Sequence, residues 1–257
     1  MSCITAAQAG ATAPVTMAGF LAQSLAETLA SLVMANVISP GFPMVFSNRP
    51  LVIDLHSGAF AGGGGETTLL NAASAQLSNR LGLPSGVECY MTDAKAIDAQ
   101  YGVEKEMTSV AAALAGGNLI YESSGMTAAL LGVSFEAFIL DDEIHAMTYR
   151  TMRGVKVSEE NLGFDAICAA ILGDGHFLGA DHTYKAMERD YHYPKLAGRE
   201  QPRTWAENGA LDAWDHAKTK ARGYWTAITL NTLMLIKMPK LELHLRSSDR
   251  LIDDIAN

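Results

Sequence analysis

The stretch VECYMTDAKAIDAQYGVEKEMTSVAAALAGGNLIY, residues 87–121, contains two short apolar runs on either side of an amphipathic segment. The two runs predict strands over Val87–Met91 and Asn118–Tyr121, because each is short, apolar and bounded by turn residues. Between them, apolar side chains at helical spacing predict a helix over Asp98–Ala115. A strand, a helix and a strand in this order are typical of a parallel sheet.

The residues before this stretch repeat the same pattern. Strands are expected at Ser2–Thr5 and Met44–Phe46, and helices from Pro14 to about Ile38 and from Glu66 to Leu81. The chain therefore predicts an α/β fold with about four strand–helix units. In such folds the functional loops follow the carboxyl ends of the strands.

Beyond residue 134 the pattern is helical. Gly and Pro signals separate four expected helices, which are Phe135–Arg153, Ser158–Leu172, Asp181–Asp190 and Thr204 to about Tyr224. We expect residues 1–225 to form the main domain. Residues 226–257 are expected to form a helical tail to which the sequence assigns no role.

Composition excludes several classes of protein. With 49% hydrophobic residues and a net charge of −9, the chain favours a globular core and disfavours contact with nucleic acid or anionic membranes. The most apolar stretch, Met17–Ile38, is interrupted by polar residues and is expected to be a buried helix. Cys3, Cys89 and Cys168 show no disulfide or metal spacing, so we expect a reducing, cytoplasmic location.

Two features resemble ligand sites only superficially. Gly62–Gly65 lacks the lysine and the spacing of a nucleotide-binding loop. His176 and His182 have no third ligand at metal-site spacing, so no metal site is expected. A zinc-dependent methyltransferase that uses Cys89 or Cys168 with a histidine stays open as a weaker alternative.

Six ordered segments resemble the trimethylamine/glycine-betaine methyltransferase family of corrinoid methyltransferases. The most specific is GATAPVTMAG at the start of Gly10–Val33. The others are SGAFAGGGGE (57–66), MTDAKAIDAQYGVEK (91–105), ALAGGNLIYESSG (113–125), SFEAFILDDEI (134–144) and GHFLGADHT (175–183). The resemblance implies a TIM-barrel fold and covers about residues 2–224. Family members are roughly twice as long, so the chain looks like the C-terminal part, a partial barrel followed by helices.

The resemblance also implies an activity. Family members move a methyl group from a methylated amine to the Co(I) of a separate corrinoid protein, so no cofactor is expected on the chain itself. A pyrrolysine serves the trimethylamine-specific members, apparently near the loop in which Lys95 is the counterpart here. Its absence favours a quaternary, glycine-betaine-like substrate. A complementing N-terminal half or a second copy of the chain is expected to complete the barrel.

A methylated ammonium ion is recognised by aromatic faces and carboxylates held in a fixed orientation. The candidate substrate-binding residues are Tyr90, Asp93, Lys95, Gln100, Tyr121 and Glu122, which lie in or after the third and fourth strands. The alternative roles are helix capping, for which Asp98 is placed, and a solvated loop carboxylate at Glu122. The competing function is a catalytically inactive truncated homologue that dimerises and at most binds a betaine-like ligand.

Overall fold

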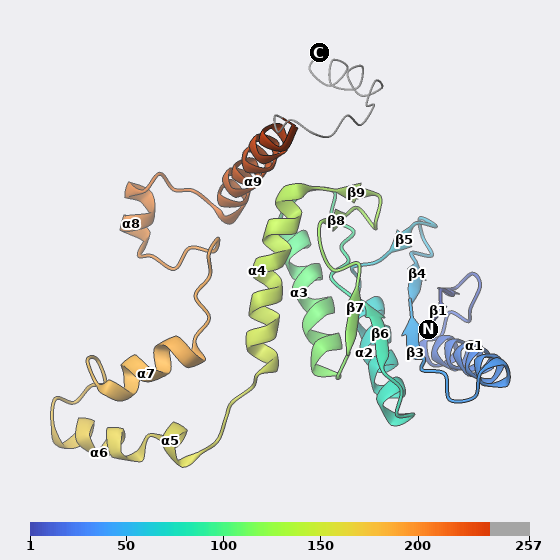
Figure 1. The fold of residues 1–257 in the computed structure, drawn as a ribbon, viewed down its shortest axis with the longest axis horizontal. Coiled ribbons are helices and arrows are strands. Elements are labelled where there is room, and N and C mark those ends of the chain that lie inside the picture. Colours follow the sequence, from blue (N-terminus) through green and yellow to red (C-terminus); the bar gives the residue numbers. More distant parts are fainter. Residues whose placement is uncertain (237–257) are drawn as a thin grey trace. The chain divides into compact units, whose positions relative to one another are not determined.

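The centre of the fold is a four-stranded sheet (Figure 1). The computed structural model describes the backbone of residues 1–236 and the side chains of residues 1–229. The strands β1 (Ser2–Thr5), β3 (Val45–Asn48), β6 (Ser85–Glu88) and β7 (Leu119–Tyr121) are parallel and lie side by side in chain order. The predicted α/β class with a parallel sheet is confirmed.

A long helix follows each of these strands. They are α1 (Met17–Ile38), α2 (Gly65–Arg80), α3 (Ala99–Leu114) and α4 (Phe135–Met152). Parallel neighbours in chain order place their crossover helices on one face of the sheet, because such crossovers are right-handed. The core contacts support this arrangement, because Val87 of β6 packs with Ala75 of α2 and Ala112 of α3. Figure 1 shows α3 and α4 side by side.

The opposite face of the sheet is not covered in the same way. Ile4 and Leu119 alternate along their strands with the core residues Cys3 and Ile120. Ile4 is 52% exposed and Leu119 is 46% exposed. Two apolar side chains thus reach solvent from the face that lacks the helices.

Two small sheets lie in the loops that follow the long strands. β2 (Gln8–Ala9), β4 (Leu51–Ile53) and β5 (Phe60–Ala61) form the first, and β8 (Met126–Thr127) pairs antiparallel with β9 (Gly132–Val133) in the second. The sequence did not predict them, because runs of two or three residues are too short to show a strand period.

Helix α1 is long and apolar enough to cross a membrane by composition alone. Phe20 of α1 is fully buried in a cluster with Leu70 of α2, but Val33, Val37 and Ile38 are exposed, so the expectation of a buried helix is correct for one stripe of α1 only. Farther along α1, Ala35 packs against Cys3 of β1. A single helix of this length and composition is weak evidence for a membrane span.

Several predicted boundaries moved where the backbone adopts positive φ. The third strand ends at Glu88 instead of Met91, because Tyr90 has φ of 60°. Gly163, with φ of 64°, divides the helix predicted over Ser158–Leu172 into α5 (Glu159–Leu162) and α6 (Phe164–Leu172).

The predicted Asp181–Asp190 helix is confirmed as α7 (Asp181–Asp190). The helix predicted over Thr204 to Tyr224 is wrong, because a left-handed Gly209 separates α8 (Pro202–Glu207) from α9 (Ala213–Ile236). Residues 155–207, which contain α5 to α8, are called the helical arm below.

The chain divides into two units, residues 1–218 and residues 219–257. The predicted domain boundary at residue 225 stays a prediction. Of the predicted tail, residues 226–236 continue α9, and residues 237–257 lie outside the described residues.

Candidate functional site at the strand ends

Three neighbouring strands bring four functional side chains to one edge of the sheet. Arg49 directly follows β3, Glu88 is the last residue of β6, and Tyr121 is the last residue of β7, followed at once by Glu122. Glu88 is in register with Tyr121. Parallel strands end at a common edge, so these residues converge although they lie far apart in sequence.

The Arg49 guanidinium is the centre of this cluster. Its Nη1 donates to Oε1 of Glu122 at 2.6 Å and lies 3.6 Å from Oε1 of Glu88. Its Cζ is 5.4 Å from the centroid of the Tyr121 ring, within cation–π range. The side chain of Glu88 is 2% exposed, whereas those of Arg49 and Glu122 are 27% and 26% exposed. Glu88 therefore forms the floor, and Arg49 and Glu122 are the parts open to solvent.

Three polar atoms of the cluster have no hydrogen-bond partner. They are Nε of Arg49, Oε2 of Glu88 and Oε2 of Glu122, and all three are buried. Buried polar atoms are usually satisfied, because an unpaired one has a free-energy cost of about 1–3 kcal/mol. The Nε of Arg49 therefore lacks an acceptor, while a proton held between Glu88 and Glu122 can satisfy the two carboxyl oxygens.

The protonation of Glu88 follows from its burial. Desolvation, together with the neighbouring Glu122 carboxyl, raises the pKa of Glu88 from 4.5 to about 8. The positive charge of Arg49 acts in the opposite direction and does not cancel these effects. At neutral pH the Glu88 carboxyl is therefore predominantly protonated.

The Tyr121 ring lies across β6, and Gly86 makes room for it. A Cβ atom on Gly86 would lie 2.5 Å from Cε2 of Tyr121 and 2.3 Å from Oγ of Ser47. The Tyr121 hydroxyl is 3.0 Å from Oγ of Ser47 and 3.2 Å from Oγ of Ser2. Hydroxyl groups from β1 and β3 thus hold the ring beneath Arg49.

The backbone also positions Glu122. Its φ is 55°, a region that non-glycine residues adopt at a cost of about 1–3 kcal/mol. Behind it, Asp141 of α4 accepts hydrogen bonds from the backbone N–H of Gly125 at 2.7 Å and from Nζ of Lys105 at 2.9 Å. Lys105 and Asp141 are fully buried, and burial lowers the pKa of Lys105. This buried ion pair anchors the loop that carries Glu122.

The sequence-predicted residues separate into two groups. Tyr121 and Glu122 join the cluster around Arg49. Tyr90 instead faces the helices: its hydroxyl bonds with Ser109 and Thr148, and its ring lies 4.2 Å from the ring of His145. The fold therefore directs Tyr90 away from the strand-end cluster.

The loop after β6 uses its polar residues for local structure. Asp93 accepts hydrogen bonds from the backbone N–H of Gly62 at 2.7 Å and of Gly63 at 3.3 Å, which fixes the glycine-rich loop. Asp98 caps α3 by accepting from the Tyr101 backbone N–H.

Gln100 donates to Oε1 of Glu104 at 2.8 Å, and Lys95 is exposed. A substrate role for Asp93, Lys95 or Gln100 stays a prediction, because none of them reaches the Arg49 cluster through a contact that the structure shows.

Sequence reasoning missed Arg49 and Glu88. Glu88 carried a usable signal, because a carboxylate between Val87 and Cys89 interrupts an apolar strand, and charged residues are rarely buried without a partner. Arg49 carried no comparable signal, since its partners lie 39 and 73 positions away along the chain.

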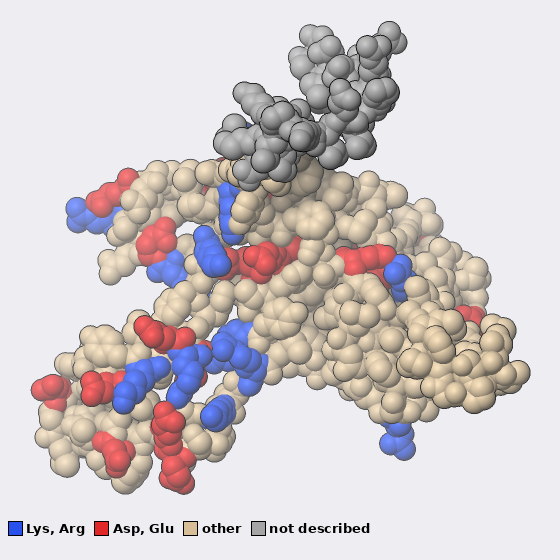
Figure 2. All heavy atoms as spheres, in the orientation of Figure 1, with Lys and Arg blue, Asp and Glu red and all other residues tan. Residues whose placement is uncertain are grey.

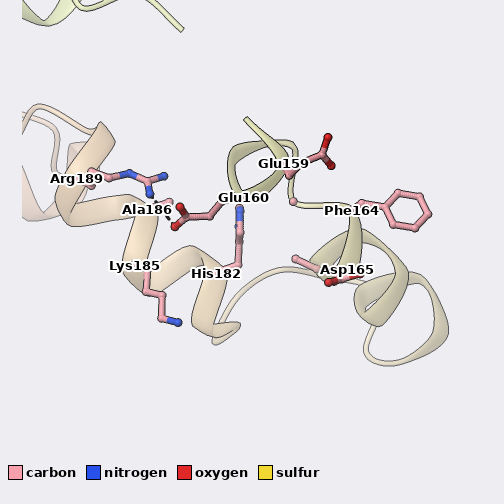
Figure 3. Close-up of a pocket in the computed structure, with 10 residues that line it drawn as sticks. Glu159, Glu160, Phe164, Asp165, His182, Lys185, Ala186 and Arg189 are labelled. Carbon is pink, nitrogen blue, oxygen red and sulfur yellow. Dashed lines mark hydrogen bonds and ion pairs between the residues drawn. The ribbon is translucent and has the colours of Figure 1, made fainter. Parts of the chain in front are cut away.

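A cavity of about 540 Å³ in the helical arm is a weaker candidate (Figure 3). Glu160 of α5 and Arg189 of α7 point toward each other across it and form an ion pair at 3.1 Å, while Phe164 points away. Arg189 also bonds to Asn161 and Asp190. The charged groups of Glu160 and Arg189, which face this cavity, are therefore already paired with each other. Among residues 1–236, no group of three His, Cys, Asp or Glu side chains could hold a metal ion.

Comparison with known proteins gives the family. A model described as trimethylamine methyltransferase (MTTB) matches residues 1–234. The glycine betaine methyltransferase of Desulfitobacterium hafniense (strain Y51) is 34% identical over 239 residues, which are 93% of this chain and 49% of that protein. The trimethylamine methyltransferase MttB of Methanosarcina thermophila is 35% identical over 210 residues, 81% of this chain and 43% of that protein. The chain thus spans about half the length of these curated relatives. It belongs to the trimethylamine methyltransferase family.

Proposed function

We propose that the protein takes part in methyl transfer from a quaternary or tertiary methylated amine, with a glycine-betaine-like zwitterion as the favoured substrate. The acceptor in this proposal is the Co(I) of a separate corrinoid protein. Family membership and the names of the relatives, which include a glycine betaine and a trimethylamine methyltransferase, support the reaction class.

The observation that carries the proposal is the cluster of Arg49, Glu88, Tyr121 and Glu122. A betaine has a carboxylate and a quaternary ammonium group. The partly exposed guanidinium of Arg49 suits the carboxylate, while the Tyr121 ring and the Glu122 carboxylate suit the ammonium group. With Glu88 protonated, Arg49 and Glu122 have no net charge together, which matches a zwitterion better than a simple cation.

The chain's own residues orient the substrate in this proposal. Arg49 holds the carboxylate, so the N-methyl groups are directed toward the solvent side of the cluster. When bound to its carrier protein, the corrinoid supplies the nucleophile that takes the methyl group. The cytoplasmic location stays a prediction.

We also propose that the sheet is part of a (β/α) barrel. The four parallel strands in chain order, each followed by a helix, are the repeat from which such barrels are built. The edge strands β1 and β7 would then pair with strands of a complementing N-terminal half or of a second copy. An inactive homologue that dimerises through these edges and at most binds a betaine is the second candidate function, and the same open edges favour it.

Ligand-dependent stability tests the substrate class. The melting temperature and solution mass are measured with glycine betaine and with tetramethylammonium, which lacks the carboxylate. We expect glycine betaine to raise the melting temperature more strongly, because a ligand that binds only the folded state stabilises it. Arg49→Gln should abolish the preference, while Arg203→Gln, which removes an exposed arginine of the helical arm, should leave it unchanged.

Methyl transfer to a cob(I)alamin-loaded corrinoid protein then separates the two candidate functions. Methylcobalamin formation with glycine betaine supports the methyltransferase. A stable dimer that binds glycine betaine without turnover supports the inactive homologue. A protein whose melting temperature responds to neither ligand contradicts both assignments of the Arg49 cluster.

A further inference from the structure

The carboxyl groups of Glu88 and Glu122 lie beside the same nitrogen of Arg49. Glu88 and Glu122 both approach the same guanidinium through Oε1, and each has a buried Oε2 without another partner. Two ionised carboxylates cannot form a hydrogen bond with each other, because neither has a proton to donate. One proton held between them converts the contact into an O–H···O bond in which Glu88 donates to Glu122.

The other groups around the pair agree with a single proton. Arg49, after β3, is the cation that the structure places against Glu88 among the described residues. Tyr121 of β7 lies beneath Arg49, and Asn71 of α2 accepts from the Glu88 backbone N–H. The neighbouring Cys89 thiol is buried, and its pKa is raised above the ordinary thiol value. One positive charge therefore faces two carboxyls, and a shared proton makes the cluster neutral.

We propose that Glu88 and Glu122 share one proton and pass it to the amine nitrogen as its bond to the transferred methyl group breaks. The inference rests on the proposed function. The methyl carbon would be transferred to the acceptor that the proposed function names, and the electron pair of the broken C–N bond would stay on nitrogen. That pair then takes the proton, which leaves two carboxylates facing Arg49 and the new ammonium ion.

The direction of this transfer is favourable. An alkyl amine has a pKa of roughly 10, comparable with that of lysine. The Glu88 carboxyl, with its pKa raised to about 8, is about a hundredfold weaker than the amine at holding a proton. After transfer, the Glu88 and Glu122 carboxylates face Arg49 and the new ammonium ion, and the substrate's own carboxylate leaves the bound site with one net negative charge. The transfer also removes the nitrogen lone pair that could otherwise attack the methyl group again.

Proton-linked binding tests the inference without turnover. Calorimetric titrations at pH 7, in two buffers of different ionisation enthalpy, give the protons released per bound ligand. N,N-dimethylglycine, which is glycine betaine without one methyl group, reaches the site already carrying its own N–H. We therefore expect it to displace about one proton from the carboxyl pair. Glycine betaine has no N–H and should displace almost none.

Glutamine variants test which carboxyl group releases the proton. Glu88→Gln keeps the shape of the buried side chain but cannot release a proton, so proton release with dimethylglycine should disappear, and Glu122→Gln should reduce it as well. Glu106→Gln is the matched control, because Glu106 is a half-buried glutamate with a raised pKa that contacts Thr148 outside the cluster. This variant should behave like the wild type.

The outcomes separate the two claims. Binding of both ligands with equal proton release, or release that survives Glu88→Gln, contradicts the shared proton while leaving the proposed function intact. Failure of both ligands to bind the wild-type protein contradicts the proposed function, and the inference falls with it. An infrared C=O band of a protonated carboxylic acid at pH 7, lost in Glu88→Gln and retained in Glu106→Gln, is the expected signature of the shared proton in the free protein.

Discussion

The sheet region, residues 1–152, and the helical arm differ in what their helices bury. Each of α1 to α4 has fully buried side chains, whereas none of α5 to α8 has a buried residue. Both regions have apolar residues at helical spacing. Figure 2 shows mixed charges gathered over the arm and a largely uncharged surface over α1. Both regions therefore have a helical sequence pattern, and they differ in how much of each helix is buried against the rest of the fold.

The physical reason is the surface available for packing. The long helices pack against the sheet or, as α4 does, against a neighbouring long helix. By contrast, α6 has nine residues, most of them apolar, and leaves Ile171 and Leu172 exposed. Short helices without such packing are only marginally stable in water. The sheet region should therefore carry most of the unfolding free energy of residues 1–218.

The largest expected effect contrasts two phenylalanines. Phe46 of β3 is 1% exposed and Phe164 of α6 is 70% exposed. Phe46→Ala should lower the free energy of unfolding by about 3–5 kcal/mol, because it removes core contacts and leaves a cavity. Phe164→Ala should change it little. Urea unfolding followed by circular dichroism measures both, and equal effects would contradict the contrast between the regions.

The second contrast concerns ion pairs. Asp141→Ala leaves the buried Lys105 ammonium and the Gly125 N–H without an acceptor, so a loss of about 3 kcal/mol is expected. Glu160→Ala, which breaks an exposed pair with Arg189 in the arm, should have no measurable effect on unfolding. The same urea experiment applies. If Asp141→Ala left the free energy of unfolding unchanged, this would show that the buried ion pair does not hold the loop.

A glycine pair gives effects of opposite sign. Gly86→Ala places Cβ against the Tyr121 ring and should destabilise the protein by about 1–3 kcal/mol. Gly102 lies within α3 with open space around it, so Gly102→Ala should stabilise by about 0.5–1 kcal/mol. Thermal unfolding measures both. Two changes of the same sign would contradict the close approach of Tyr121 to Gly86.

The last contrast is a dependence of stability on pH. The pKa of Glu88 is raised from 4.5 to about 8, so the folded protein holds this proton more tightly than the unfolded chain. Its stabilising contribution is complete below pH 4.5 and is lost as the pH rises through 8. The free energy of unfolding should fall by up to about 1.4 kcal/mol per pH unit in that interval.

In the arm, Arg189 lowers the pKa of Asp190, so that carboxylate titrates below the same interval. Urea unfolding at several pH values, with wild type and Glu88→Gln, isolates the slope that belongs to Glu88. An identical slope in the variant would contradict a raised pKa at Glu88.

The sequence predicted the long elements well. The helix expected over Asp98–Ala115 is observed as Ala99–Leu114, and the one expected over Phe135–Arg153 as Phe135–Met152. These segments are long, and their apolar residues recur at one period. Breaks at Gly163 and Gly209 were not predicted, because a glycine inside a helical pattern does not show whether its φ is positive.

The sequence by itself determined the family resemblance, the order of the long strands and helices, and the position of Tyr121 at the end of a strand with Glu122 directly after it. Only the tertiary structure decided that Arg49 lies beside Tyr121 and Glu122 and that Glu88 is buried next to Arg49. It also decided that Tyr90 faces the helices. Strand register sets which residues meet across 39 to 73 positions of chain, and burial sets whether a carboxyl is charged. Neither quantity is a property of a local stretch of sequence.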